Sequence, residues 1–310
     1  MKKILIIAAS LICIIGLSVF AFFSKSESTQ AENGENVFLK LQVMTEEIPD
    51  VDSKIILKQT AQILEKRLSG NGIQNVKIEL YDSSEIGLTI PAEDYYLHED
   101  TPHRIRRLIV SKGDLQFRET AENSIVWIIL DKTPVPSLLV REEYNRACIG
   151  YAEEVDMAAI EMMFDNYGVR NELKDAGITL MWSAKPVKDS NTYELIAIKE
   201  VKENERILDG EDVKSARGTI DRYGNGNATV EITMTNEGAK AWADFTHRNI
   251  GRHVAIILDS LVYSYPIVAS RIDGGLSSIT GNITIEEAQD LAGVLESGAL
   301  PVTVKIIEEK

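Results

Sequence analysis

The sequence predicts an α+β protein that follows one N-terminal membrane helix. Residues 4–23 form an uncharged and mostly apolar run, which is typical of a membrane segment. Beyond residue 35, short segments with alternating apolar residues indicate strands, and segments with apolar residues at helical spacing lie between them. The 310 residues, 44% hydrophobic and 26% charged, are enough for one large or two ordinary domains with packed cores.

Residues 1–24 are predicted to be a membrane anchor or a signal. The apolar run extends from Ile4 through Leu11 to Phe23, and as a helix its twenty residues span roughly 30 Å, the thickness of a bilayer core. The run is longer than the roughly 7 to 15 apolar residues of a cleaved signal, so we expect an uncleaved anchor. Cleavage after Ala31, in Thr-Gln-Ala, remains an alternative.

The charges around the apolar run predict its orientation. Lys2 and Lys3 precede the run, and positive flanks stay in the cytoplasm, so everything after residue 24 should lie outside. Residues 25–35 are polar and are expected to be a tether. In the exported part only Cys148 is a cysteine, which excludes an intrachain disulfide there. A net charge of -15 makes nucleic acid an unfavourable partner.

Residues 36–120 show the order β-α-β-β-α-β. The apolar stripe of the first helix is Leu57, Ala61, Leu64 and Leu68, with an N-cap at Asp52 or Ser53. This order is that of a ferredoxin-like fold, a four-stranded antiparallel sheet with two helices on one face. The strands are expected at 37–43, 76–80, 86–90 and 115–118, and the helices at 53–70 and 101–111.

The remaining chain falls into three expected parts. Residues 121–204 form an insertion of uncertain fold, with an apolar run at 125–130, a helix at 155–164 and strands at 180–183 and 193–198. Residues 205–299 form a second α+β unit, in which Thr284 and Glu287 make a capping box for the last helix. Residues 300–310 contain a last strand at 302–307. The glycine-rich stretch 273–281 is expected to be a loop.

The sequence offers no pattern that predicts chemistry. The four histidines include no pair at i and i+4 on one helix, and no His/Cys cluster has metal-ligand spacing. The stretch 273–281 lacks the Gly-Lys-Ser/Thr ending of a phosphate loop, and Ser277 and Ser278 have no nucleophile elbow around them. We therefore expect no catalytic residue, no cofactor and no metal site, and the protein is not expected to be an enzyme.

Four sequence blocks resemble the end of the large periplasmic domain of SecD, a membrane component of bacterial protein export. They are Asn-Glu-Gly-Ala-Lys-Ala-Trp at 236–242, Asn-Ile-Gly-Arg-His-Val-Ala-Ile-Ile-Leu-Asp at 249–259, Ser-Ile-Thr-Gly-Asn-Ile-Thr-Ile-Glu-Glu-Ala at 278–288 and Leu-Glu-Ser-Gly-Ala-Leu-Pro at 295–301. Leu-Glu-Lys-Arg-Leu at 64–68 with Gly-Asp-Leu-Gln-Phe-Arg-Glu at 113–119, and Trp-Ser-Ala-Lys-Pro at 182–186, resemble other parts of the family.

The resemblance implies a division into a base and a head. The ferredoxin-like base would comprise 36–120, the SecD-like head 205–299, and 300–310 would return to the base. Thr120, Gly298 and Pro301 are then the expected hinge residues, because two connections between base and head must both absorb a rotation.

In the family a bundle of membrane helices follows this domain, and this chain is expected to lack it. Proton coupling there depends on ionisable groups inside membrane helices, and residues 4–23 contain no Asp, Glu, Lys, Arg or His. The chain alone is therefore not expected to be a proton-driven motor.

The resemblance implies a single-pass protein of the cytoplasmic (inner) membrane with a periplasmic domain. Its expected partners are the Sec translocon or SecD/SecF-type membrane components, where it would be an accessory, and unfolded exported polypeptides. Trp242, Tyr263, Tyr265 and Leu276 are the candidate polypeptide contacts, with core packing as the alternative explanation for the aromatic residues. A second hypothesis is an envelope binding or structural module that keeps the SecD fold but recognises a dedicated partner.

Overall fold

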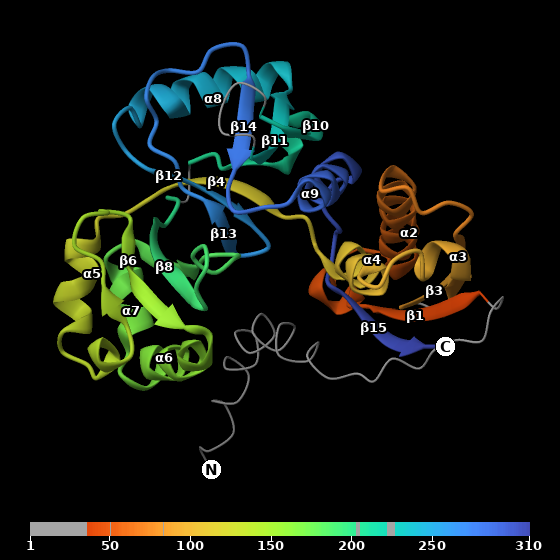
Figure 1. Cartoon of the computed structure of the whole chain (residues 1–310), viewed down its shortest axis with the longest axis horizontal. Helices are drawn as coiled ribbons and strands as arrows, with labels where there is room; N and C mark the ends of the chain where they lie inside the picture. Colours follow the sequence, from red (N-terminus) through yellow and green to blue (C-terminus); the bar gives the residue numbers. More distant parts are fainter. Residues whose placement is uncertain (1–35, 50, 83, 203–204, 222–226) are drawn as a thin grey trace. The chain divides into compact units, whose positions relative to one another are not determined.

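The computed structural model describes residues 36–49, 51–82, 84–202, 205–221 and 227–310. The expected anchor, with Ile4, Leu11 and Phe23, and the expected tether lie outside these residues. Among the helices of the described ranges, none has the length and apolar character needed to cross a membrane. The described part is a mixed α/β structure with four antiparallel sheets (Figure 1).

The first sheet, with the helices on one of its faces, is called the base here. Its strand order β15-β1-β3-β2 is that of a ferredoxin-like sheet. Its core contains side chains from the strands and from both long helices, among them Leu39, Leu64 and Ile105, each 0% exposed. The base consists of β1 (Val37–Val43), α2 (Ser53–Gly70), β2 (Lys77–Tyr81), β3 (Glu85–Ile90), α3 (Ala92–Tyr95), α4 (Thr101–Val110) and β15 (Val304–Glu309).

The first long helix shows how the sequence specifies these elements. The Lys54 N–H donates to the Asp52 carboxylate (2.9 Å), which caps the start of α2. Leu57, Leu64 and Leu68 are at most 1% exposed, and burial of one such side chain stabilises the fold by roughly 1.5–3 kcal/mol. The N-cap, which was expected at Asp52 or Ser53, is Asp52.

One strand of the expected base lies elsewhere. We expected 115–118 to be the fourth strand of the ferredoxin-like sheet, and this is wrong. Residues Leu115–Glu119 form β4, which pairs with β12 and β9 in another sheet, whereas β15 at the C-terminal end takes the fourth position beside β1. The alternating pattern of 115–118 fits either sheet, so it could not identify the partner strand.

Two sheets share the second core and are called the central unit. Their orders are β13-β12-β4-β9 and β10-β11-β14, and their common core includes Phe117, Ile232 and Trp242. Residues 276–280, expected to lie in a loop, form the strand β14, which pairs with β11. The elements are β4, β9 (Leu208–Asp209), β10 (Val213–Ile220), β11 (Ala228–Met234), α8 (Asn236–Arg248), β12 (Val254–Leu258), β13 (Leu261–Ser264), β14 (Leu276–Thr280) and α9 (Ile285–Ser297).

Helix α9 packs into both cores. Its Val294 belongs to the core of the base, and its Leu291 and Leu295 belong to the core of the central unit. Two glycines permit this close packing: a Cβ on Gly218 of β10 would lie 2.5 Å from the Gln289 backbone nitrogen, and a Cβ on Gly293 would lie 2.3 Å from the Asn71 side chain. Thr284 and Glu287 form the expected capping box at the start of α9, which is confirmed.

The described residues of the insertion, 121–202, fold as a helical layer packed on a sheet. Its sheet has the order β5-β6-β8-β7, and its buried residues include Trp127, Phe164 and Ile178. The apolar run at 125–130 lies in a helix, and the helix expected at 155–164 is present as part of α6. The elements are α5 (Asn123–Leu130), β5 (Val140–Arg141), β6 (Cys148–Glu153), α6 (Glu154–Asn166), α7 (Val169–Asp175), β7 (Ile178–Trp182) and β8 (Thr192–Lys199).

Candidate functional site

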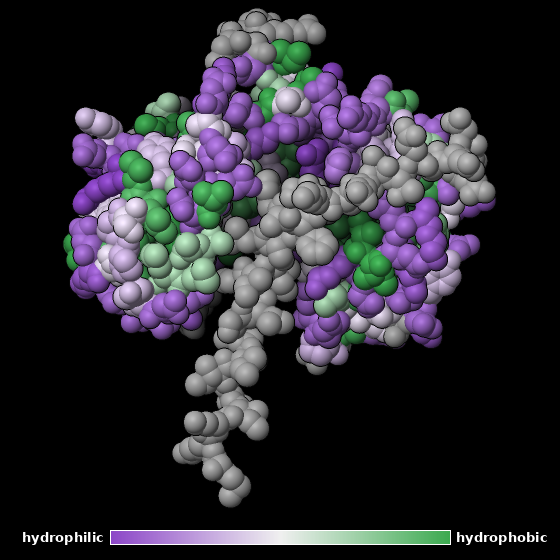
Figure 2. All heavy atoms as spheres, turned by 60° about the horizontal axis from the view of Figure 1, so that its bottom comes forward, coloured by the Kyte–Doolittle hydropathy of each residue, from purple (hydrophilic) through white to green (hydrophobic). Residues whose placement is uncertain are grey.

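A cleft of about 420 Å³, the β13 cleft, lies between the insertion and the central unit. One wall is the segment after β7 together with Glu194 of β8, and the other walls are β13 with the residues after it and the turn after β14. The cleft is lined by Ser183, 185–188, Glu194, 262–266 and 280–282. Figure 2 shows a mostly polar surface with separate apolar patches. Because such patches are scattered, the cleft is a better indication of a binding site than exposed apolar area.

The wall formed by β13 is fixed by its hairpin turn. Asp259 and Ser260 both have positive φ (51° and 66°), as the two-residue turn between β12 and β13 requires. The Asp259 carboxylate accepts hydrogen bonds from the backbone N–H groups of Gly113 (2.8 Å) and Asp114 (2.9 Å) and from the Ser111 hydroxyl (2.6 Å). The hairpin is therefore attached to the segment that joins α4 to β4.

The wall formed by the insertion is attached at two points. The Ala184 N–H donates to the Val262 carbonyl (2.8 Å), so the chain after β7 pairs with the outer side of β13. The Lys185 ammonium forms an ion pair with the carboxylate of Glu287, which is also the capping residue of α9. These two contacts fix the segment after β7 beside β13.

Two tyrosines of the cleft have neutral hydroxyl groups at physiological pH. Burial raises the pKa of Tyr263 to about 12. Burial, and then the hydrogen bond that the Tyr265 hydroxyl donates to Glu194 (2.5 Å), raises the pKa of Tyr265 as well. Nδ1 of His253 donates to the Tyr265 carbonyl (2.8 Å), which fixes the backbone behind the tyrosine ring. The tyrosines thus offer ring surface and neutral polar groups, not a base.

The four candidate contact residues have different positions. Tyr263 and Tyr265 line the β13 cleft. Leu276 is 67% exposed on β14 but does not line the cleft. Trp242 is 4% exposed and packs against Phe117, with ring centroids 4.8 Å apart, so the expectation that it contacts a polypeptide is not supported and core packing explains it.

The candidate hinge residues also lie apart. Gly298 caps the end of α9 with φ 87°, and Leu300, next to Pro301, donates its N–H to the Lys112 carbonyl (2.7 Å). These residues therefore lie beside 111–114, where the chain passes from the base to the central unit. Thr120 instead donates its hydroxyl to the His253 carbonyl (3.0 Å) and forms a β-bridge with the insertion, so it lies between the central unit and the insertion.

Arg67 was not among the residues predicted from the sequence, although it joins residues 111–112 to the end of α9. Its side chain is 0% exposed and donates to Leu108 O (2.9 Å), Ser111 O, Lys112 O (3.5 Å), Ser297 Oγ (3.0 Å) and Gly298 O (3.0 Å). Burial lowers its pKa to about 10, and the Asp259 carboxylate opposes this shift. One sequence feature could have indicated that Arg67 is buried: it lies three residues after Leu64, on the apolar side of α2.

Groups of side chains that could carry chemistry were sought among the described residues. No group of three or more His, Cys, Asp or Glu residues in the described ranges is arranged to hold a metal ion. Ser277 and Ser278 lie on β14, whose backbone pairs with β11. The β13 cleft provides two tyrosine rings, backbone groups and two lysines.

Comparisons with known proteins place the chain in a family. Residues 188–302 match the family model for the SecDF P1 head subdomain. The protein translocase subunit SecD of Rhodothermus marinus is 30% identical over 300 residues, which covers 82% of this chain and 46% of that protein. The chain thus spans about half the length of this relative.

Two solved structures have the same fold. A crystal structure of SecDF in a super-membrane-facing form matches with TM-score 0.55 and 22% identity, covering 96% of this chain and 34% of that chain. A structure of SecDF, described as a membrane component that enhances protein export, matches with TM-score 0.53 and 25% identity, covering 87% of this chain and 98% of that chain. The chain therefore belongs to the SecD/SecDF protein-export family, and its described part corresponds to the first periplasmic domain of these proteins.

Proposed function

We propose that this chain is a membrane-anchored, extracytoplasmic SecD-type domain that binds polypeptide segments during translocation, as an accessory of the Sec machinery. The β13 cleft is the observation that carries the proposal, because most of its lining, including Tyr263 and Tyr265, lies within residues 188–302, which match the family's head subdomain. The proposal assigns no proton-driven step to the chain, since its long apolar run 4–23 has no Asp, Glu, Lys, Arg or His.

Binding would combine backbone pairing with a pocket for a side chain. In the described part β14 is the end strand of its sheet, and Thr280 at its end lines the β13 cleft. An extended segment that pairs with β14 would place a side chain at the rings of Tyr263 and Tyr265. Backbone pairing tolerates many sequences, which is what a general export factor requires.

The test is photo-crosslinking in living cells from a benzoyl-phenylalanine at Lys188, an exposed residue of the cleft wall. Adducts with many exported polypeptides, or with translocon subunits, are expected. The control probe replaces Met162, which is 60% exposed on α6 and does not line the cleft. Equal adduct patterns from both positions would contradict the proposal.

A blocking variant tests the cleft itself. Thr280→Trp fills the cleft, and Ser278→Trp adds the same side chain two residues earlier on β14, at an exposed residue that does not line it. We expect the first variant, and not the second, to abolish the Lys188 adducts with exported chains.

A second candidate is an envelope module with a dedicated partner. Exposed apolar side chains on the insertion helices favour it: Ile128 is 66% exposed, Val155 76% and Met162 60%. One dominant envelope protein, captured from Met162 rather than Lys188, would support this candidate over the export accessory.

A further inference from the structure

One edge strand of the base, β2, carries the charged residues Lys77 and Glu79 but has no β-bulge in its described residues. In the described part β2 is the end strand, and it pairs with β3 in a continuous register. Edge strands of soluble proteins are usually shielded by bulges or covering elements. The opposite edge strand, β15, has a register shift where it passes Lys40 and Leu41, whereas β2 has none and exposes Leu80 by 50%.

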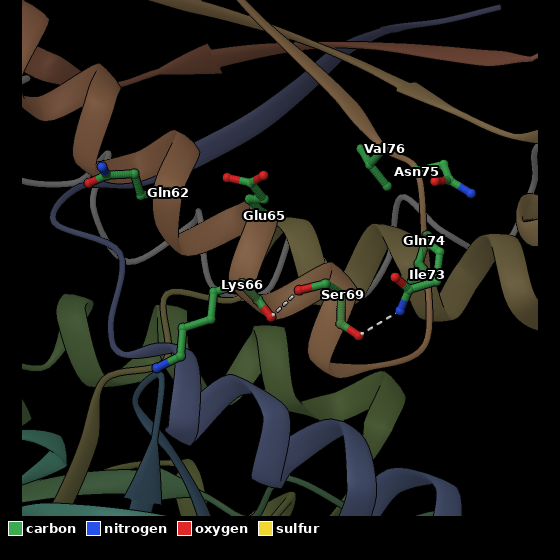
Figure 3. Close-up of a pocket in the computed structure, with 8 residues that line it drawn as sticks. All are labelled: Gln62, Glu65, Lys66, Ser69, Ile73, Gln74, Asn75 and Val76. Carbon is green, nitrogen blue, oxygen red and sulfur yellow. Dashed lines mark hydrogen bonds between the residues drawn. The ribbon is translucent and has the colours of Figure 1, made fainter.

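A hollow lies between α2 and the segment that precedes β2. Figure 3 shows it between α2, which contributes Gln62, Glu65 and Ser69, and the segment that leads from Ile73 to Val76 at the start of β2. Its volume is about 420 Å³, and its lining mixes apolar and polar side chains. It is therefore large enough to receive a side chain from a strand that pairs with β2.

The two faces of β2 have different chemistry. Ile78 and Leu80 pair with Leu88 and Ile86, which are fully buried in the core beneath the helices, so Val76, Ile78 and Leu80 lie on the helix side. Lys77, Glu79 and Tyr81 lie on the opposite side of the sheet, and Tyr81 donates its hydroxyl to Glu79 (2.6 Å). One face of the edge is thus apolar, and the other face is polar, with the charged residues Lys77 and Glu79.

We propose that β2 pairs antiparallel with β2 of a second copy of this chain, about a two-fold axis at Ile78. In this register Leu80 of each copy lies opposite Val76 of the other, at the hollow. Lys77 of each copy lies opposite Glu79 of the other, which makes two pairs of opposite charge. The edge is therefore complementary to itself on both faces, and its pairing gives a continuous eight-stranded sheet.

Neighbouring registers lack this match. An axis at Lys77 or at Glu79 would place a residue opposite its own copy and so bring like charges together. An axis at Leu80 would place Ile78 opposite Asp82. A two-fold axis placed between two residues of β2 would bring the apolar face of one copy onto the same side as the charged face of the other. One register is thus favoured, which makes the proposal specific enough to test by position.

The first test is disulfide crosslinking between two tagged full-length chains co-expressed in membranes, both with Cys13 and Cys148 replaced by Ala. One chain carries Lys77→Cys and the other carries Glu79→Cys. A crosslink between the two tags is expected to exceed the Glu79–Glu79 crosslink of a single variant at least about fivefold, since opposite residues have Cβ atoms about 5 Å apart and diagonal ones lie at about 7–8 Å.

Two outcomes would overturn the proposal. One is no crosslink between the tags, and the other is capture of exported polypeptides by Lys77→Cys in place of a second copy. The second outcome would show that β2 receives extended segments of other proteins. Because the β13 cleft shares no residue with this edge, its photo-crosslinks test the proposed function separately.

The second test measures self-association of the purified full-length chain in detergent by sedimentation. Lys77→Glu is expected to raise the dimer dissociation constant roughly tenfold, and adding Glu79→Lys should restore it, because the exchange recreates both charge pairs. Leu80→Asp should weaken the dimer further. Ile307→Asp is its matched control, since Ile307 is 51% exposed on the other edge strand. A monomer at all concentrations, or equal effects of the two Asp variants, would refute the pairing.

Discussion

Replacing the buried Arg67 by methionine tests how the base is joined to the central unit. The guanidinium lies at the C-terminal ends of two helices, α4 and α9, whose last carbonyl groups have no partner within the helix. Among its acceptors are Leu108 O at the end of α4, Ser111 O just after it and Gly298 O just after α9. A cation is favoured at such ends by the helix dipoles.

The expected cost follows from two opposing terms. Arg67→Met leaves these three carbonyl oxygens without the guanidinium, and each buried acceptor that loses its partner costs roughly 1–3 kcal/mol. The lowered pKa, from 12.5 to about 10, indicates that desolvation of the charge costs about 3 kcal/mol, which the neutral methionine avoids. We therefore expect a net loss of about 3 kcal/mol in the free energy of unfolding.

The assay is urea unfolding combined with hydrogen exchange of single amides. Exchange should accelerate at Leu300, whose N–H bridges the two connections, and at Gly113, whose N–H donates to Asp259. Lys66→Met is the matched control, because Lys66 also donates to α9, through Glu296 O, but is exposed and should contribute less than about 1 kcal/mol. Equal stability of the two variants would refute this account of Arg67.

Three further predictions concern other parts of the structure. Gly218→Ala should cost about 1–3 kcal/mol in urea unfolding because its Cβ would meet the backbone of α9, while Gly70→Ala, with open space, should not destabilise the protein. Burial raises the pKa of the Cys148 thiol to about 12, so the unfolded chain loses this proton at lower pH than the folded chain. The free energy of unfolding should therefore fall as pH rises from 9 to 12. At pH 8 the folded thiol should resist alkylation, as measured by mass spectrometry of the peptide that contains Cys148. Tyr265→Phe should cost about 1.5–3 kcal/mol by removing the donor to Glu194, and an unchanged urea midpoint would contradict this.

Local signals in the sequence predicted the element boundaries well. Asp52 and the Thr284/Glu287 pair were recognised because an N-cap depends on residues within one helical turn. The fourth base strand was assigned wrongly because pairing is decided far along the chain. Leu115 and Phe117 alternate equally well for either sheet, whereas residues 300–310 were expected to return to the base, and β15 does pair there with β1.

Residue type alone could not identify the site. Tyr263 and Trp242 are both aromatic residues of the central unit, yet one lines the β13 cleft and the other is packed between Phe117 and Phe245. The difference depends on which side of a helix or strand faces the core, and residue type does not specify that side. The role of Arg67 could not be predicted because most of its acceptors are backbone carbonyls, which no sequence motif marks.

Helix α9 connects the candidate site to the junction with the base. At its first turn Glu287 pairs with Lys185 of the cleft wall, and after its last turn Gly298 accepts from Arg67. A helix of 13 residues is about 20 Å long and behaves as one stiff element. A polypeptide that draws Lys185 away from Glu287 would therefore act on the same element that Arg67 holds at its other end. Binding in the cleft and the attachment of the base are then linked through one helix, and loss of either end contact should change the other.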